Sequence, residues 1–314
     1  MKRKMLNVPK GGYDGMKGFT IVEFLVAGLL SVIVLIAVVS SYFTSRKLND
    51  AANERLAIQQ DLRNAATLIV RDARMAGSFG CFNMSEHIEQ DVVSDVTQKN
   101  SPFSLKRNST RNSANKLIPI AESSNIVYQG FAQVRPALIF QYGIDDVNAS
   151  AETTVVSSCG AISKPGKQIP TLEDAKKELK IQNSGKEQNG NIARQRHVVN
   201  AYAVGRIAGE EGLFRFQLDD KGKWGNPQLL AKKIKRMKVL YIYVSGCPED
   251  EDAGKEEQFK YTDKFDSSVT PAGVEVLLDS GLNAKIVASS DNSIYAYRIN
   301  ATIRGGNVCA NRTL

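Results

Sequence analysis

The stretch KGFTIVEFLVAGLLSVIVLIAVV, residues 17–39, decides the fold class of this 314-residue chain. Within it, residues 19–39 form a run of 21 in which only Thr20, Glu23 and Ser31 are clearly polar. Because an α-helix rises about 1.5 Å per residue, the run predicts about 31 Å of apolar helix. That length matches the hydrocarbon core of a bilayer, so we expect a transmembrane helix at this end of the chain.

The residues before this run are basic. Residues 1–18 contain five Lys or Arg and one Asp, a charge of +4, whereas the whole chain carries +8. The remaining +4 is an ordinary balance and does not indicate nucleic-acid binding. A basic flank on one side of an apolar span favours a cytoplasmic location for that side.

Two features distinguish the apolar run from an ordinary secretory signal. A signal core has 7 to 15 apolar residues, fewer than are present here. Glu23 also lies inside the run, where a carboxyl group near hydrocarbon is costly and implies a purpose. The alternative is conventional cleavage, for which residues 39–41 (Val-Ser-Ser) loosely resemble a small-residue site.

The helical pattern continues beyond the membrane segment. Residues 46–76 contain neither Gly nor Pro, and good helix formers dominate them. One amphipathic stripe comprises Ala51, Ile58, Leu62, Ala65, Ile69, Ala73 and Ala76. The other faces carry Arg55, Asp61, Arg63, Arg71 and Asp72. With Gly77 and Gly80 as a stop, we expect one helix over residues 19–76, its first half suited to lipid and its second half to the flank of a β-sheet.

Four cysteines, Cys81, Cys159, Cys247 and Cys309, all follow the apolar segment. None forms a Cys-x-x-Cys pair, and an even number fits disulfides in an oxidising compartment. Loop closure favours Cys81–Cys159 with Cys247–Cys309 over nested or crossed pairings. Free buried thiols are the main alternative, and zinc is a weaker one because the only two histidines have no zinc-ligand spacing to a cysteine. We therefore expect no metal and no cofactor.

Beyond residue 80 the chain predicts a β-rich head. Alternation and β-branched or aromatic residues predict strands over residues 125–130, 137–142, 153–158, 197–206, 213–218, 239–244 and 295–303. Residues 85–124 and 163–196 are long and polar, which predicts surface loops, the second with a helix over residues 172–179. The spacing of Leu230, Ile234 and Met237 among basic residues predicts a short amphipathic helix before residue 239.

The sequence contains no catalytic motif. Neither His87 nor His197 has a recognisable motif around it, and no GxSxG, P-loop or HExxH is present. The basic residues 232–238 and the acidic residues 249–252 have the pattern of solvated surfaces, without interleaved aromatic residues or calcium-loop spacing. We therefore expect a protein that is not an enzyme and that does not bind nucleic acid.

Residues 17–23, Lys-Gly-Phe-Thr-Ile-Val-Glu, together with the apolar run resemble the class III signal of type IV prepilins and pseudopilins. The resemblance implies that prepilin peptidase cuts between Gly18 and Phe19 and that the new amine of Phe19 is N-methylated. It also implies that Glu23, fifth in the mature chain, pairs with the terminal amine of a neighbouring subunit and sets the assembly register. A carboxylate among apolar helices needs such a partner unless it protonates; the alternative is a carboxylate that snorkels to the headgroups.

Residues 69–77 with Gly80 and Cys81 resemble the helix end of PilW-type minor pilins, called PilJ in neisserial species. Residues 228–231 and 237–241 resemble a helix-to-strand element of the same family. Ser40 stands where major pilins commonly carry a kinking Pro, which favours a minor subunit. The resemblance implies an α+β, type IV pilin-like fold, with a long N-terminal helix packed on an antiparallel β-sheet head with long surface loops.

That architecture divides the chain into a cleaved leader (1–18), a transmembrane helix (19–44), its amphipathic continuation (45–77) and a periplasmic head (78–314). The implied protein is a non-catalytic minor pilin that initiates or caps type IV pilus assembly. It would cross the inner membrane once, N-terminus in the cytoplasm, before entering the pilus (fimbrium). Expected partners are prepilin peptidase, the major pilin, other minor pilins, the inner-membrane assembly platform and the lipid bilayer. The alternatives are a minor pseudopilin at the tip of a type II secretion pseudopilus and a competence pilin for DNA uptake; an enzyme with a membrane anchor is a more distant one.

Overall fold

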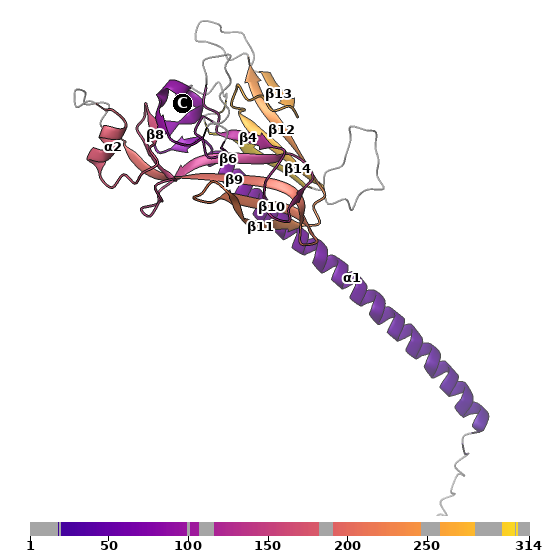
Figure 1. Ribbon diagram of the computed structural model, residues 1–314. Helices are drawn as coiled ribbons and strands as arrows, with labels where there is room; N and C mark the ends of the chain where they lie inside the picture. The colour runs from indigo at the N-terminus through magenta and orange to yellow at the C-terminus, as the bar shows by residue number, and fades with distance from the viewer. Residues whose placement is uncertain are drawn as a thin grey trace, which may run out of the picture. The chain divides into compact units, whose positions relative to one another are not determined.

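The computed structural model describes residues 18, 20–98, 101–106, 116–181, 191–245, 258–279, 297–304 and 306. The chain divides into two compact units, residues 1–57 and 58–314. Its fold is α+β: a long N-terminal helix and several β-sheets (Figure 1).

Helix α1 (Ile21–Met75) is 55 residues long and confirms the single long helix that the sequence predicts. Just after it, Gly77 has φ +78°, a left-handed conformation that a side chain would strain. A Cβ atom at Gly77 would also lie 3.0 Å from the ring of Pro119, so both backbone and packing favour glycine where the helix stops.

In its described residues, the first unit contains α1 as far as Ala57, including the apolar run. An 18-residue window in this helix reaches a mean hydropathy of 2.9, long and apolar enough to cross a membrane. None of that window is buried within the chain. The helix therefore presents an apolar surface that its own chain does not cover, as a membrane span requires.

In the second unit, the C-terminal part of α1 buries the predicted stripe. Its members Leu62, Ala65, Ile69, Ala73 and Ala76 are all at most 3% exposed. Ile58 packs against them while partly exposed, and Ala51 is exposed. The stripe is therefore confirmed from residue 58 onward, and its small side chains let the helix approach the head closely.

Within its described residues, the head contains a nine-stranded sheet and a four-stranded sheet. The larger sheet comprises β3 (Val92–Asp95), β4 (Ile120–Ser123), β5 (Ala132–Gln133), β6 (Ala137–Ile144), β7 (Thr154–Ser157), β8 (Ile162–Lys164), β9 (Ala193–Ile207), β10 (Glu210–Leu218) and β11 (Trp224–Lys232). The smaller sheet has the order β13 (Gln258–Thr262), β12 (Arg236–Ser245), β14 (Gly273–Asp279), β15 (Tyr297–Thr302). Short elements complete the head: β1 (Ser78–Phe79), β2 (Phe82–Asn83), the 3₁₀ turns η1 (Met84–Glu86) and η2 (Glu89–Asp91), and helix α2 (Leu172–Glu178).

The main core joins these layers. It contains the α1 stripe together with Phe140 and Tyr202 of the larger sheet and Tyr241 and Val276 of the smaller one. Within the head, both sheets therefore share one hydrophobic core with the end of α1. The paired strands that the structure describes are antiparallel except β3 with β8, which are parallel, so the expectation of a purely antiparallel head is wrong at this edge.

The helix predicted before residue 239 is also wrong. Residues 224–245 form β11, a three-residue connection and β12, which carry the chain from the larger sheet into the smaller one. In that connection the amide of Lys233 donates to Glu211 O at 2.8 Å, and that of Lys235 donates to Asp279 O at 2.9 Å. These acceptors belong to different sheets, and Ile234 is fully buried. Tertiary partners therefore override the helix-like spacing of the apolar residues.

Of the other predictions for the head, some are confirmed and some are wrong. The strands over residues 137–142, 153–158, 197–206, 213–218 and 239–244 are confirmed as parts of β6, β7, β9, β10 and β12, and the helix over residues 172–179 as α2. The strand over residues 295–303 is confirmed as β15 from residue 297, and residues 295–296 lie outside the described residues. The strand over residues 125–130 is wrong, because this segment is irregular and the amide of Ile126 donates to the Gln133 side chain at 2.8 Å. The loop over residues 85–124 is wrong in part, because it includes β3, β4 and the buried Phe103 and Leu105.

Candidate assembly site

The N-terminal residues highlighted by the sequence lie at the start of α1. Gly18 is exposed, and Phe19 is outside the described residues. Thr20 and Glu23 form a reciprocal cap: the backbone N and the hydroxyl of Thr20 each donate to Glu23 Oε2 at 3.0 Å, and the amide of Glu23 donates to Thr20 Oγ1 at 3.3 Å. The Glu23 carboxylate therefore has partners in its own chain and closes the first turn of the helix.

Large apolar side chains cover all faces of the helix after this cap. Leu25, Leu29, Ile33 and Ile36 are each more than half exposed, as are most other large apolar residues between positions 21 and 43. Exposed apolar surface around the whole circumference of a helix is typical of contact with lipid or with other helices.

At the other end of α1, Asp72 forms the centre of a buried polar cluster that sequence reasoning missed. The helical periodicity predicts Asp72 on an outer face, but Asp72 is 0% exposed. Its carboxylate accepts hydrogen bonds from Tyr142 OH at 2.9 Å, from Asn200 Nδ2 at 2.9 Å and from Tyr202 OH at 2.6 Å. The only available signal is that Asp72 follows Ile69 by three residues and so borders the buried stripe.

Two arginines balance the charge of Asp72. Arg71 Nη2 lies 3.0 Å from Oδ1, and Arg215 Nε lies 3.5 Å from Oδ2. Burial and the neighbouring carboxylate raise the pKa of Tyr142 to about 12 and raise that of Tyr202 further, so both phenols stay protonated donors at neutral pH. The cluster ties the end of α1 to β6, β9 and β10 with defined hydrogen bonds as well as apolar contacts.

The turn after α1 is held by a disulfide. Cys81 and Cys159 are bonded, with their Cα atoms 4.7 Å apart. Beside the bond, Ser157 Oγ donates to Phe79 O at 2.6 Å. The link joins the chain just beyond α1 to the end of β7, and this pair is the first of the two that the sequence favours. Cys247 and Cys309 lie outside the described residues.

The side chains of both histidines contact neighbouring residues of the head. His87 stacks on Phe82 with ring centroids 4.1 Å apart, and its Nδ1 lies 3.0 Å from Asp91 Oδ2. His197 is 1% exposed, and its Nε2 lies 3.1 Å from Gln141 Oε1. Burial, reinforced by the nearby ammonium of β8, lowers the pKa of His197 well below its ordinary value, so His197 is neutral at pH 7.

Lys164, which carries that ammonium, is the most unusual charged group in the described part of the head. It is 1% exposed, and its Nζ donates to Phe103 O at 2.8 Å and lies 3.3 Å from the centroid of the Phe103 ring. Burial lowers the pKa of Lys164 to about 7, although Asp95 opposes this shift. Lys164 thus connects β8 to the segment that contains Phe103.

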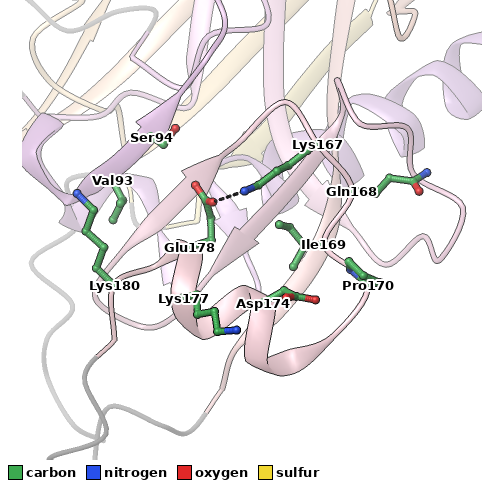
Figure 2. Close-up of a pocket in the computed structure, with 10 residues that line it drawn as sticks. All are labelled: Val93, Ser94, Lys167, Gln168, Ile169, Pro170, Asp174, Lys177, Glu178 and Lys180. Atoms are coloured by element: carbon green, nitrogen blue, oxygen red, sulfur yellow. Dashed lines mark ion pairs between the residues drawn. The ribbon is translucent and has the colours of Figure 1, made fainter.

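A surface pocket of about 570 Å³ lies between β3 and α2 (Figure 2). Figure 2 shows Lys167 and Glu178 pointing toward each other across it, with their charged atoms 3.4 Å apart, and Ser163 Oγ donates to the other oxygen of Glu178 at 2.8 Å. Asp174 accepts from the Thr171 hydroxyl at 2.6 Å. Two of the charged residues that line this pocket, Lys167 and Glu178, therefore pair with each other. Within the described ranges, no group of three or more His, Cys, Asp or Glu could hold a metal ion.

No protein-family model matches the chain, and no curated protein sequence matches it. The class of protein must therefore be inferred from its own residues and geometry. The features that carry that inference are the capped start of α1, its exposed apolar surface and its anchored C-terminal end.

Proposed function

We propose that this chain is a non-catalytic minor pilin of the PilW type, which helps to initiate or cap type IV pilus assembly. One observation carries the proposal: a single 55-residue helix is apolar and uncovered in its first part and is packed into a β-rich head in its last part. Such a helix can reside in a bilayer and later exchange lipid for neighbouring helices without refolding of the head.

The mechanism is associative. The apolar part of α1 holds the subunit in the inner membrane, with its basic start in the cytoplasm and its disulfide-bonded head in the periplasm. Prepilin peptidase removes residues 1–18, and Phe19 becomes the N-methylated terminus. The assembly platform then moves the subunit into contact with the major pilin and other minor pilins, where Glu23 faces a neighbour's terminal amine.

N-terminal mass analysis of the membrane-extracted protein tests this proposal. In cells with active prepilin peptidase, the mature chain should begin at a methylated Phe19. The Gly18→Val variant should remain uncleaved, because a branched side chain hinders the scissile peptide. A Cβ atom at Gly18 meets no other atom within 4 Å, so a folding defect is not expected.

Gly28→Val is the matched control, because Gly28 also has open space around it and lies in the same apolar segment. It should be cleaved normally. A mature terminus near Ser41, or an intact leader in cells with active peptidase, would refute the proposed function.

A further inference from the structure

Strand β13 (Gln258–Thr262) presents an open edge of the smaller sheet. Within the described residues it pairs only with β12, in an antiparallel register that runs from Tyr241 opposite Thr262 to Ser245 opposite Gln258. Residues 258–261 are all exposed, so neither face of this part of the strand is covered. In an edge strand, alternate N–H and C=O groups point away from the neighbouring strand and can pair with a further one.

One face of β13 carries two large aromatic side chains. The register places Phe259 opposite Val244 and Tyr261 opposite Ile242, whereas Lys260 lies opposite Tyr243 on the other face. Phe259 is 59% exposed and Tyr261 is 60% exposed. Two exposed aromatic rings on one face of one strand form an apolar surface of the kind that binds a partner.

The other face borders a surface pocket of about 530 Å³, whose lining includes Tyr243 of β12. Two lysines, Lys260 and Lys264, and one acid, Asp266, also line it. The Asp266 carboxylate accepts hydrogen bonds from the amide of Ser268 at 2.8 Å and from its hydroxyl at 2.6 Å. The pocket therefore has a positive balance of charge, which favours an acidic side chain.

The β11 edge of the larger sheet lacks these properties. Pro227 in β11 has no N–H to donate, Asn226 has a left-handed φ of +47°, and the pairing of β11 with β10 shifts register twice. Such features hinder the addition of another strand. The pairing of β13 with β12 is regular along its whole length, and β13 contains no proline.

Lys260 disfavours pairing of β13 with the same strand of a second copy. Antiparallel pairing of two such strands about their centres would place Phe259 opposite Tyr261 but Lys260 opposite Lys260. Like charges directly opposite each other destabilise a strand pair. A strand with an acidic residue at the centre and an apolar residue on each side would instead match the lysine and both aromatic rings.

We propose that β13 binds an extended segment of another protein by strand addition, and that this segment has an acidic residue between two apolar residues. Its main chain pairs with the open edge, its apolar side chains lie on Phe259 and Tyr261, and its acidic side chain enters the pocket beside Lys260. Main-chain pairing supplies affinity, and the alternating side chains supply specificity. The inference goes beyond the proposed function and does not depend on it, since it uses neither leader cleavage nor the apolar part of α1.

Photocrosslinking to a synthetic peptide tests the proposal. A benzophenone-bearing phenylalanine replaces Phe259 in the full-length protein in detergent micelles, and the probe is a biotinylated peptide centred on the sequence Thr-Val-Glu-Val-Thr. The probe should label the protein saturably. The same peptide with lysine in place of its glutamate should label it at least about threefold less, because a like charge then faces Lys260.

Backbone methylation of the probe tests the strand pairing itself. One peptide is N-methylated at both valines, and another at the glutamate and the following threonine. Because an added strand uses alternate amides, one of these peptides should label the protein and the other should not. Equal labelling by both, or loss with both, would overturn strand addition.

Two variants of the chain make the test specific. Lys260→Glu, in the same photoreactive protein, should reverse the preference, so that the lysine peptide labels better than the glutamate peptide. An unchanged preference would overturn the assignment of Lys260. As the matched control, the photoreactive residue replaces Val147, which is 79% exposed in a turn outside any strand, and it should capture little peptide. Equal capture there would mean non-specific adhesion and would overturn the proposal.

A mixture of two differently tagged copies without peptide tests the rival occupant. The photoreactive residue at position 259 should not join the two copies appreciably. A saturable crosslink between copies, as strong as that to the glutamate peptide, would identify a second copy as the occupant and overturn the inference.

Discussion

At the scale of single residues, the two buried charged residues Asp72 and Lys164 have contrasting surroundings. Asp72 is surrounded by three hydrogen-bond donors and two guanidinium groups, so its charge is compensated where it is buried. The contacts of Lys164 Nζ with the described residues are a carbonyl, an aromatic face and a neutral imidazole. The first arrangement compensates the buried charge, whereas burial penalises the charged form of Lys164.

Removal of Asp72 should destabilise the head strongly. Asp72→Ala removes the carboxylate that faces Arg215 and that accepts from Tyr142, Asn200 and Tyr202. The loss of this buried partner should lower the free energy of unfolding by about 3 to 5 kcal/mol. Urea denaturation of the full chain in detergent micelles measures the effect. Asp50→Ala, an exposed substitution on the same helix, should change stability by less than about 0.5 kcal/mol. Equal effects of the two would contradict a central role for the Asp72 cluster.

Lys164 should make stability depend on pH. Its pKa falls from 10.5 to about 7 on folding, so between these values the unfolded chain binds the additional proton. The free energy of unfolding should therefore rise with pH across this window, by up to about 1.4 kcal/mol per pH unit from this residue, and the full penalty of the buried charge applies below pH 7.

Lys164→Met should remove that pH-dependent contribution whatever it does to stability at one pH. The comparison is a set of urea titrations of both proteins at pH 6, 8 and 9.5. Lys221→Met, an exposed lysine of the β10–β11 turn, serves as the control and should leave the slope unchanged. If the Lys164 variant retains the wild-type slope, another group titrates.

At the scale of elements, α1 combines two surfaces with different physical demands. Its first part exposes large aliphatic side chains, which favour lipid, whereas its last part presents alanines and isoleucine at close range to the sheets. A reciprocal cap closes its start and a left-handed glycine follows its end. The element therefore has a defined limit at each end.

Substitutions at Glu23 can separate the role of its carboxylate in capping α1 from its proposed role in assembly. Glu23→Gln keeps an acceptor for the Thr20 amide but removes the charge, and Glu23→Ala removes both. Both variants should remain in the membrane fraction, since the segment becomes no less apolar. If a neighbour's amine pairs with this carboxylate, both should lose surface pili in a strain with no other copy.

Two outcomes would contradict that interpretation. Full piliation by Glu23→Gln with loss in Glu23→Ala would mean that the cap, and not the charge, is what assembly needs. Loss of membrane localisation in either variant would assign the residue to insertion. Glu23→Asp, which keeps the charge on a shorter side chain, should give an intermediate pilus yield.

At the scale of the whole molecule, contacts distant in sequence hold the head together. Tyr202 reaches Asp72 across 130 residues, and the Cys81–Cys159 bond closes a separation of 78. The connection at residues 233–235 adds covalent continuity between the two sheets, with Ile234 in their common core. The end of α1 is therefore held to the head by contacts from segments that lie far apart in the sequence.

The disulfide should contribute substantially to that attachment. Loss of the bond in the Cys81→Ser, Cys159→Ser double variant should lower the free energy of unfolding by about 4 kcal/mol in the chain-entropy model. Alkylation of the denatured, unreduced wild type should label none of the four cysteines if the Cys247–Cys309 pair is also formed. Labelling of Cys247 and Cys309 alone would be consistent with the Cys81–Cys159 bond and would reject the Cys247–Cys309 bond.

The sequence by itself determined the features that depend on local periodicity. These are the apolar run, the single long helix, its buried stripe and most strands with clear alternation. Strand β14 (Gly273–Asp279) was missed because it is buried along its entire length and has no alternation to detect. The amphipathic helix before residue 239 was predicted wrongly for the related reason that an apolar spacing of three to four residues also fits a chain passing between two sheets.

Only the tertiary structure decided which polar residues are buried and what surrounds them. Asp72 and Lys164 look like ordinary surface charges in the sequence, because their partners, such as Tyr202 and Phe103, lie far along the chain. The groove beside residues 63–75 likewise depends on the fold, since Tyr297 of β15 lines it together with residues of α1. Burial of a charge is decided by contacts that chain folding brings together, and no local pattern encodes them.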